Sequence, residues 1–577
     1  MVSLKINNIP VKVPEGTTIL EAANKIGVKI PTLCFMKDIN AIGACRICVV
    51  EVKGARSSCA ACVYPVSEGM EVFTDTPKIR ESRKTTLELI LSDHNKDCLS
   101  CDRNMHCELQ KLAYEYGCDA HAFSGVVADR TDDFSTPYLV RDNSKCILCR
   151  RCVAVCSKIQ HCGVINPKYR GFKTEIGQAF DEDLSATACA GCGQCINVCP
   201  TGALHEKSEI DNVLAAIADP EKIVIAGVAP SVRAGIGEEF GYPIGTNAEG
   251  KMVKAMKMLN FDKVFDVNVT ADLTILEEAN ELVERLTTGG VTPMITSCSP
   301  GWVRFLEYYY PELIPNLSTC KSPQQMFGAI VKTYYAKKAG IDPKNIYVVS
   351  VMPCVAKKFE KTRDDQAASG YPDIDAAITT RELARMIKRA GIDFKKIKND
   401  TFDNPLGEYT GAGVIFGATG GVMEAALRTA VETVSGKTLE NVEFKEVRGT
   451  KGIKEATYKA GDVVVNVAVA SGLENARKIC DEIKNGTSKY QFVEIMACPG
   501  GCVNGGGQPI VDAYTRRNVD VRALRAKVLY GIDDKKELRK SHESPVCKAI
   551  YSEYLGKPGS HEAHKVLHTS YVPRKKY

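Results

Sequence analysis

Two cysteine-rich blocks carry the clearest chemical signal in the sequence. The first reads CILCRRCVAVC and the second CAGCGQCINVCP, and each has the spacing C-x2-C-x2-C-x3-C. In this spacing three thiolates wrap one iron–sulfur cube and the fourth reaches a neighbouring cube. We therefore expect one [4Fe–4S] cluster on Cys146, Cys149, Cys152 and Cys199, and a second on Cys156, Cys189, Cys192 and Cys195. A pair of zinc sites is the alternative, which the doubled pattern disfavours.

A third group of cysteines lies nearer the N-terminus. Cys34, Cys45, Cys48 and Cys62 have a C-x10-C-x2-C-x13-C layout. The layout is similar to a plant-type [2Fe–2S] site, although its first spacing is longer than the plant-type C-x4-C. Cys59 is a rival to Cys62 as the fourth ligand, and a lone zinc site is the alternative use of the group.

A fourth group contains one histidine and three cysteines. His94, Cys98, Cys101 and Cys107 occur in the stretch HNKDCLSCDRNMHC. One imidazole and three thiolates can hold a [4Fe–4S] cube, and the same set can hold zinc. His106 competes with His94 for the histidine position. Four clusters in succession would form a path for single electrons.

Composition limits the remaining possibilities. The chain has 577 residues with 25 cysteines, a net charge of +5 and 44% apolar residues. This near balance of charge gives no broad basic field for nucleic acid. No apolar run is long enough to cross a membrane, and the first residues alternate rather than forming a signal-peptide core. We therefore expect a cytoplasmic protein whose cysteines bind metal, because disulfides are rare in a reducing compartment.

Secondary-structure patterns divide the chain. Residues 1–13 alternate like strands, and PEGTTILEAANKIG predicts a helix that starts at Thr17 or Thr18 and stops at Gly27. Residues 79–125 look mostly helical. From about residue 220, apolar segments such as KIVIAGVAP, NIYVVSVMP and VVVNVAVA alternate with amphipathic helices, which predicts an α/β domain with parallel strands.

Three short stretches in this second part point to another metal site. They are TSCSPGW (296–302), MPCVAKKFE (352–360) and EIMACPGGCVNGGGQP (494–509). Their thiols, Cys298, Cys354, Cys498 and Cys502, are candidate ligands, and the glycines would let backbone pass close to a bulky inorganic group. These stretches resemble the three active-site signatures of the [FeFe]-hydrogenases. The N-terminal array is similar to that of the family's large members with four accessory clusters.

The resemblance implies a multidomain fold of α+β and α/β parts. Residues 1–78 would form a β-grasp [2Fe–2S] domain and residues 79–125 a small helical His/Cys3 [4Fe–4S] domain. Residues 126–209 would form a ferredoxin domain with two [4Fe–4S] clusters. Residues 210–577 would form a large α/β catalytic domain with a tail similar to the family's small subunit.

The resemblance also implies an H-cluster, a [4Fe–4S] cube joined to a two-iron unit that carries CO, cyanide and an azadithiolate. By motif, Cys354, Cys498 and Cys502 would bind the cube, with Cys502 as the bridge, and Lys357 would anchor a cyanide. The other residues expected to line the cavity are Pro230, Ser231, Pro323, Gln324, Met352 and Met496. The reaction implied is reversible heterolytic cleavage of H2.

A proton route is implied by position in the same family. Cys298, Glu278, Ser318 and Glu281 match its relay, with Arg285 near the mouth. Glu278 and Glu281 are three residues apart in a predicted helix, so both should lie on one face. A buried carboxyl there would have a raised pKa, suited to passing protons. Without the resemblance, two such glutamates would be read as a solvated helix face.

The stretch TSCSPGW departs from the family in one respect. Family members commonly have two adjacent cysteines here, the second of which is the cube's fourth ligand, and this chain has Cys298 and Ser299. Three fourth ligands are open. Ser299 could bind as an alkoxide, although a hydroxyl gives up its proton reluctantly. Cys298 could shift and bind, or Cys320 of STCKSPQQ could replace it; otherwise Cys320 is a buried core thiol.

Within the family, the chain looks most like catalytic subunits of NAD(P)-linked, multi-subunit hydrogenases, some of which bifurcate electrons. Partners would then be flavoprotein or iron–sulfur subunits and ferredoxin, with flavin supplied by another subunit. The glycine-rich segment 411–421 lacks the spacing of a dinucleotide site. Two alternatives remain: an electron-transfer subunit like that of respiratory complex I, and a hydrogenase-like sensor or assembly factor without the two-iron unit. The C-terminal signatures argue against the first, and Lys357, Glu278 and Cys298 argue against the second.

Overall fold

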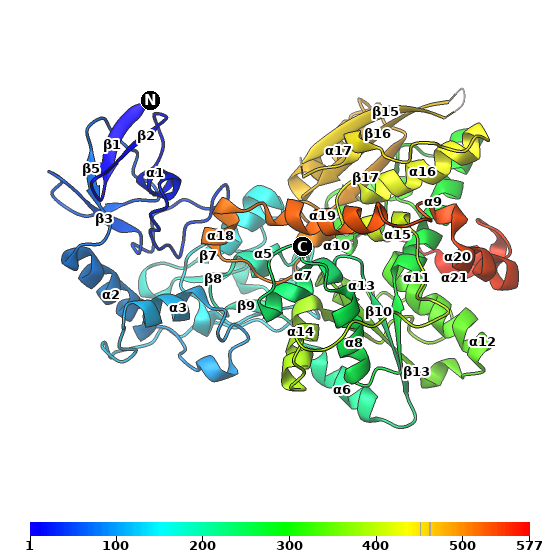
Figure 1. Cartoon of the computed structure of the whole chain (residues 1–577), viewed down its shortest axis with the longest axis horizontal. Helices are drawn as coiled ribbons and strands as arrows, with labels where there is room; N and C mark the ends of the chain where they lie inside the picture. The colour runs from blue at the N-terminus through cyan, green and yellow to red at the C-terminus, as the bar shows by residue number, and fades with distance from the viewer. Residues whose placement is uncertain (451, 461–462, 577) are drawn as a thin grey trace.

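The computed structural model describes residues 1–450, 452–460 and 463–576. Small N-terminal modules, blue to cyan in Figure 1, lie on one side of the molecule, and a larger body, green to red, lies on the other. Among the described helices there is no segment with the length and apolar character needed to cross a lipid bilayer.

The first module is a five-stranded sheet with one helix, and it ends where α2 begins. Its strand order is β2-β1-β5-β3-β4. The bounds are β1 Val2–Ile6, β2 Ile9–Val13, α1 Ile19–Lys25, β3 Val49–Val52, β4 Cys59–Ala60 and β5 Glu71–Phe73. The predicted helix start is confirmed, because Thr18 caps α1 and exchanges hydrogen bonds with Glu21 in a capping box.

The second module consists of α2 (Pro77–Ser92) and α3 (Glu108–Glu115) joined by a long loop. The two stretches expected to be helical are helical, whereas the cysteine-containing segment between them is loop with one short turn at Cys98–Ser100. Buried Arg83 ties α2 to the first module by donating hydrogen bonds to the carbonyls of Ile47 and Val49.

The third module holds the doubled cysteine blocks. It contains β6 Leu139–Arg141, α4 Arg151–Ala154, β7 Asn166–Lys168, β8 Glu175–Gly177, α5 Gln194–Val198 and β9 Leu204–Glu206. β6 pairs with β9 and β7 with β8, both antiparallel. The short helices α4 and α5 carry the third cysteine of each block, so each block wraps into a tight loop ahead of its helix.

The large body contains two four-stranded sheets. The first has the order β11-β10-β13-β14 and is parallel throughout; the second has the order β12-β17-β16-β15. The bounds are β10 Ile223–Val228, β11 Lys263–Asp266, β12 Met294–Ile295, β13 Ile346–Met352, β14 Ala376–Thr379, β15 Ile453–Ala460, β16 Val463–Ser471 and β17 Phe492–Met496. In the second sheet β15 is an antiparallel edge strand, so the prediction of parallel strands is wrong there. Two strands this close in sequence can pair only as a hairpin.

Helices surround both sheets. The bounds are α6 Ile210–Ala218, α7 Val232–Gly235, α8 Glu249–Met258, α9 Asn268–Thr288, α10 Pro300–Tyr309, α11 Pro323–Ile330, α12 Ala336–Ala339, α13 Ala356–Glu360, α14 Thr380–Arg389, α15 Gly411–Ile415, α16 Gly421–Ser435, α17 Leu473–Lys484, α18 Ala513–Asn518, α19 Val521–Asp533, α20 Pro545–Ile550 and α21 His561–Leu567. The long helix α9 packs against both α11 and α16, so it connects the layers of the two sheets.

Candidate active site with its electron and proton routes

The carboxyl ends of four parallel strands converge on one place in the large body. β10 is followed by Pro230 and Ser231, β13 by Cys354, β12 by Cys298, and β17 by Cys498. Ligands bind preferentially beyond the carboxyl ends of parallel strands, because the loops there point away from the sheet. Here the loops that follow strands of both sheets surround one common space.

That space is a cavity of about 80 Å³. The predicted residues that line it are Pro230, Ser231, Cys298, Ser299, Pro323, Gln324, Met352, Cys354, Lys357, Met496, Cys498 and Cys502. Protein interiors are close-packed. A space of this size beside several thiols therefore fits a bulky inorganic group.

The chemistry of the lining also fits a metal cluster. Cys354, Cys498 and Cys502 all line this one cavity, and cysteine thiolates are the usual ligands of iron–sulfur clusters. The glycines after Cys502 are tightly packed: a Cβ on Gly505 would lie 2.0 Å from the carbonyl oxygen of Pro353. The loop 498–507 can therefore press against the Cys354 loop only with glycine at this position.

Lys357 is held at the cavity wall by a hydrogen-bond network. Its Nζ donates to the Ser322 hydroxyl at 2.7 Å, to the Glu360 carboxylate at 2.8 Å and to the Cys298 carbonyl at 3.3 Å. The Gln324 amide also donates to Glu360, at 3.1 Å. The ammonium is thus positioned beside the cavity without free rotation. Glu360 was not among the predicted site residues. Its position three residues after Lys357 could have indicated the pair, because residues three apart on a helix lie on the same face.

The three candidates for the fourth ligand differ in whether they line the cavity. Ser299 lines the cavity, and its hydroxyl accepts a hydrogen bond from the Ala497 amide at 3.2 Å. Cys298 also lines it, and burial together with the charges of Glu278 and Cys502 raises its pKa. Cys320 is fully buried but does not line the cavity, and its thiol lies 3.8 Å from Glu281. This placement argues against Cys320 as the fourth ligand.

The residues predicted as a proton relay lie between the cavity and the surface, and hydrogen bonds join the outer three of them. Glu278 and Glu281 lie on one face of α9 as expected, and Arg285, four residues further on, extends that face. Ser318 donates a hydrogen bond to Glu281 at 2.9 Å, and Glu281 accepts one from Arg285 at 2.6 Å. Exposure rises along the path: Glu278 is fully buried, whereas the side chains of Glu281 and Arg285 are each 13% exposed.

Glu278 is the unusual group of this path. Its burial, and the charge of Glu281 next to it, raise its pKa to about 8. Within the described residues neither carboxyl oxygen has a hydrogen-bond partner. A buried carboxyl that is protonated at neutral pH and has free lone pairs can both give and receive a proton.

Two further cavities lie in the third module. One is lined by Cys146, Cys149, Cys152 and Cys199, and the other by Cys156, Cys189, Cys192 and Cys195. These are the two predicted ligand sets, including the exchange of the fourth cysteine between blocks. Cys162, which lies outside both four-cysteine blocks, also lines the second cavity.

The four thiols of the first module lie together. Hydrogen bonds with Cys45 and Cys62 hold the pKa of Cys34 below its usual range, and Cys62 also contacts Cys48. Cys59 instead contacts the Ser57 carbonyl, at 3.8 Å, so the structure favours Cys62.

His94 fits a ligand position in the second module. Burial lowers the pKa of His94 to about 4, and its Nδ1 is buried without a partner among the described residues. A neutral imidazole with one free nitrogen is what a metal requires. His106 lies in a different environment, near Glu239 and Lys388.

The third module meets the cavity directly. The Cys498 thiol lies 3.9 Å from the carbonyl oxygen of Cys192, and Cys192 lines both its own cavity and the central one. Gln194 and Asn197 of α5 donate hydrogen bonds to the carbonyls of Asn504 and Gly505, at 2.9 and 3.0 Å. One cluster site therefore adjoins the next through short backbone contacts.

Comparison with known proteins agrees with this arrangement. The chain is 46% identical to the NADP-reducing hydrogenase subunit HndD of Solidesulfovibrio fructosivorans over 587 aligned residues, covering 100% of both proteins. Residues 222–506 match the family described as iron only hydrogenase large subunit, C-terminal domain. The chain belongs to the [FeFe]-hydrogenases. It is an oxidoreductase that acts on H2, with iron–sulfur domains ahead of its catalytic domain, and the resemblance seen in the sequence is confirmed.

The other matches cover the remaining parts of this hydrogenase. Residues 1–77 match a 2Fe-2S iron-sulfur cluster binding domain, 83–121 an NADH-ubiquinone oxidoreductase-G iron-sulfur binding region, 145–203 a 4Fe-4S dicluster domain, and 519–574 an iron hydrogenase small subunit. Iron hydrogenase 1 of Clostridium pasteurianum is 45% identical, over 99% of this chain and 100% of that one. The structure of a HydA1 variant from Chlamydomonas reinhardtii superposes with a TM-score of 0.57, at 41% identity, over 64% of this hydrogenase and 99% of that chain.

Proposed function

We propose that this hydrogenase oxidises H2 and reduces protons reversibly at an H-cluster in the central cavity, exchanging electrons with NAD(P)-linked flavoprotein subunits, ferredoxin or both. The observation that carries the proposal is the meeting of three features at one cavity: the thiols of Cys354, Cys498 and Cys502, the ammonium of Lys357, and Cys298, the innermost residue of the predicted proton path. A surface electron-transfer subunit would need only the cysteines.

Each group of residues would have one task. Cys354, Cys498 and Cys502 would hold the cube, with Ser299 or Cys298 at its fourth corner, and Lys357 would donate hydrogen bonds to the anionic ligands of the two-iron unit. When bound, the H-cluster supplies the redox chemistry of H2 cleavage. Pro230, Ser231, Pro323, Gln324, Met352 and Met496 would exclude water and shape the cavity. The Met side chains suit this because they adapt to irregular surfaces.

Protons and electrons would leave in different directions. Protons would pass from Cys298 to Glu278, then through Ser318 to Glu281 and out beside Arg285. Electrons would pass from the cavity to the Cys192 cluster, the Cys149 cluster and then the two N-terminal clusters. This assigns one [2Fe–2S] and three [4Fe–4S] accessory clusters to the chain, in the domains 1–78, 79–125 and 126–209, ahead of a catalytic domain at 210–577.

The partner assignment rests on similarity to HndD, whose name describes NADP reduction. Bifurcation would need flavin, which a partner subunit would supply. An expected cytoplasmic location fits such soluble partners. Anaerobic co-purification followed by H2-dependent reduction of NAD⁺, NADP⁺ and ferredoxin tests this assignment, and reduction of artificial dyes alone would contradict it.

Infrared spectroscopy of anaerobically purified, matured protein tests the active site. We expect CO and cyanide bands that shift when H2 is added, because the two-iron unit changes redox state. Active, iron-replete protein without those bands would overturn the proposal. Iron-replete protein with neither the bands nor H2 turnover would instead favour the sensor or assembly-factor alternative.

A further inference from the structure

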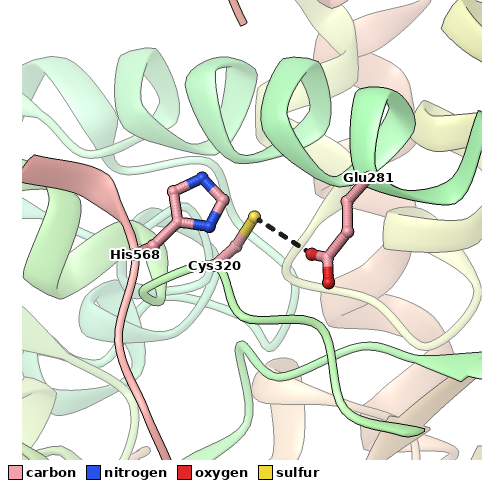
Figure 2. A group of neighbouring side chains, drawn as sticks. All are labelled: Glu281, Cys320 and His568. Atoms are coloured by element: carbon pink, nitrogen blue, oxygen red, sulfur yellow. Dashed lines mark hydrogen bonds between the residues drawn. The ribbon is translucent and has the colours of Figure 1, made fainter. Parts of the chain in front are cut away.

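Three potential metal ligands of different types meet at the outer end of the proton path. Glu281 comes from α9, Cys320 from the segment ahead of α11, and His568 from the residue after α21. One ligand atom of each lies within 4.8 Å of the other two. Figure 2 shows the Cys320 sulfur between the carboxylate and the imidazole.

The backbone holds these segments in fixed positions. Cys320 and His568 face each other across a short antiparallel bridge. The Lys321 amide donates to the Leu567 carbonyl at 2.8 Å, and the Thr569 amide donates to the Thr319 carbonyl at 2.8 Å. Because the three side chains already converge without metal, binding would cost little further conformational entropy. This geometry therefore favours metal binding.

The surrounding hydrogen bonds also orient the three side chains. His568 Nε2 lies 3.1 Å from the buried carboxylate of Glu277, and its Nδ1 lies 2.8 Å from the Thr319 hydroxyl. A carboxylate on one imidazole nitrogen is the usual support for a histidine that binds metal through the other. Rotation of the Thr319 hydroxyl would free Nδ1 for a cation. The Glu281 carboxylate is held by the Ser318 hydroxyl and the Thr319 amide.

Thiolate, imidazole and carboxylate together suit zinc or a similar cation. Zn²⁺ takes sulfur, nitrogen and oxygen ligands and, with three protein ligands, keeps a fourth position for water. Binding would release the Cys320 proton to solvent. One thiolate and one carboxylate would then balance the double positive charge in a site where Cys320 is fully buried and the His568 side chain is 7% exposed.

We propose that Glu281, Cys320 and His568 bind one Zn²⁺ ion or a similar thiophilic divalent cation, and that the bound ion closes the proton route. The second half rests on the proposed function. Glu281 uses its carboxylate to accept from both Ser318 and Arg285, so a cation on that carboxylate removes the acceptor through which protons leave. The positive charge also repels protons at this point.

Zinc binding is tested first, on anaerobic protein with all clusters loaded. Equilibrium dialysis against Zn²⁺ should show one more tightly bound ion in the native protein than in Cys320→Ala or His568→Ala, because loss of a ligand should weaken binding by more than the roughly 10- to 100-fold that loss of an outer-shell partner costs. Zinc-edge X-ray absorption should show one sulfur at about 2.3 Å. Cys480→Ala is the matched control, because Cys480 is an equally buried thiol on α17. Equal zinc content and spectra in native and Cys320→Ala protein would overturn the site.

The proton-gating half is tested by H2 evolution with and without Zn²⁺, each variant compared with its own zinc-free rate. Native protein and Cys480→Ala should lose about tenfold or more of their rate, since a positioned proton-transfer group contributes on that scale or above. The loss should be reversed by a chelator with CO and cyanide bands unchanged. Cys320→Ala should keep its rate. Zinc bound without inhibition would overturn gating but keep the site; absence of any H2 turnover would count against the proposed function and leave the dialysis result to decide the site.

Discussion

Among single residues, Glu278 is predicted to control proton transfer most strongly. Glu278→Gln keeps the size of the side chain but cannot ionise, so we expect H2 evolution to fall about 10²- to 10⁴-fold, the range for loss of a positioned acid or base. CO and cyanide bands should remain. Glu284→Gln, at an exposed position of the same helix, is the control. Retention of more than half the native rate in Glu278→Gln would remove Glu278 from the route.

The pKa of Glu278 gives a second prediction, on pH. The carboxyl has an ordinary pKa near 4.5 when unfolded and about 8 when folded, so the folded state binds the extra proton between these values. The contribution of Glu278 to the free energy of unfolding should therefore fall as pH rises from 4.5 to 8 and level off above 8. Denaturant midpoints of native protein and Glu278→Gln should diverge in favour of the variant over this window. Parallel curves would contradict the buried, protonated assignment.

The position of Cys320 predicts the outcome of a ligand test. Because its thiol faces Glu281 and not the cavity, Cys320→Ser should leave the EPR signal of the H-cluster cube intact. Cys498→Ser, at a residue that lines the cavity, should abolish that signal while the accessory clusters persist. Loss of the cube signal in Cys320→Ser would return Cys320 to the list of ligands.

Residue spacing predicted which cysteines bind metal better than it predicted which residues surround them. Thiolates two or three residues apart can close on one cube only in a few ways, so the two sets around Cys149 and Cys192 could be written from the sequence. The partners of Lys357 and the place of Cys320 depend on contacts between segments distant in the chain. Such contacts leave no local pattern in the sequence.

At the scale of elements, the loop after β17 is wedged against the third module. A Cβ on Gly506 would lie 2.5 Å from the Cys192 carbonyl oxygen and 2.7 Å from the Cα of Gly193, both backbone atoms that cannot turn aside. Gly506→Ala should therefore displace the Cys192 loop and cost about 1–3 kcal/mol of stability, as overpacking does. It should also slow reduction of the accessory clusters by H2, measured by rapid-mixing EPR.

Gly531→Ala is the matched control for that variant, because a Cβ there meets no atom within 4 Å. Its electron-transfer kinetics should match those of the native protein. If Gly506→Ala also matched, the contact between α5 and the loop 498–507 would not limit electron transfer.

The elements themselves were predicted to different degrees. α1 and α9 carry strong local signals, a capping box and a long amphipathic repeat, and both form as expected. The strand β16 was correctly expected, but its pairing with β15 was not, because apolar runs predict a strand without naming its neighbour. The convergence of two sheets on one cavity is a tertiary property and was visible only through the family resemblance.

For the whole molecule, the order of modules predicts where electrons enter or leave. The N-terminal sheet lies at one end of the molecule (Figure 1). Cys48→Ala should remove the [2Fe–2S] cluster and reduce H2-dependent reduction of the physiological partner, while reduction of a small dye that reaches nearer clusters continues. Cys118→Ala, at a thiol outside the predicted ligand sets, is the control. Unchanged partner reduction in Cys48→Ala would mean that electrons enter at another module.

The cavity is bounded by the tips of strands from both sheets and by a loop of the ferredoxin module, so no one of these bodies contains a complete set of anchoring thiols. Iron bound there would link the two sheets and the ferredoxin module. Without bound iron, each of these three parts would keep its fold but would lose the link between them. The contacts around Cys298, Cys354 and Cys192 would then be the places where the protein can open. Insertion of the metal would then stabilise these contacts. Protease cleavage and hydrogen–deuterium exchange at these contacts should decrease once the metal is bound.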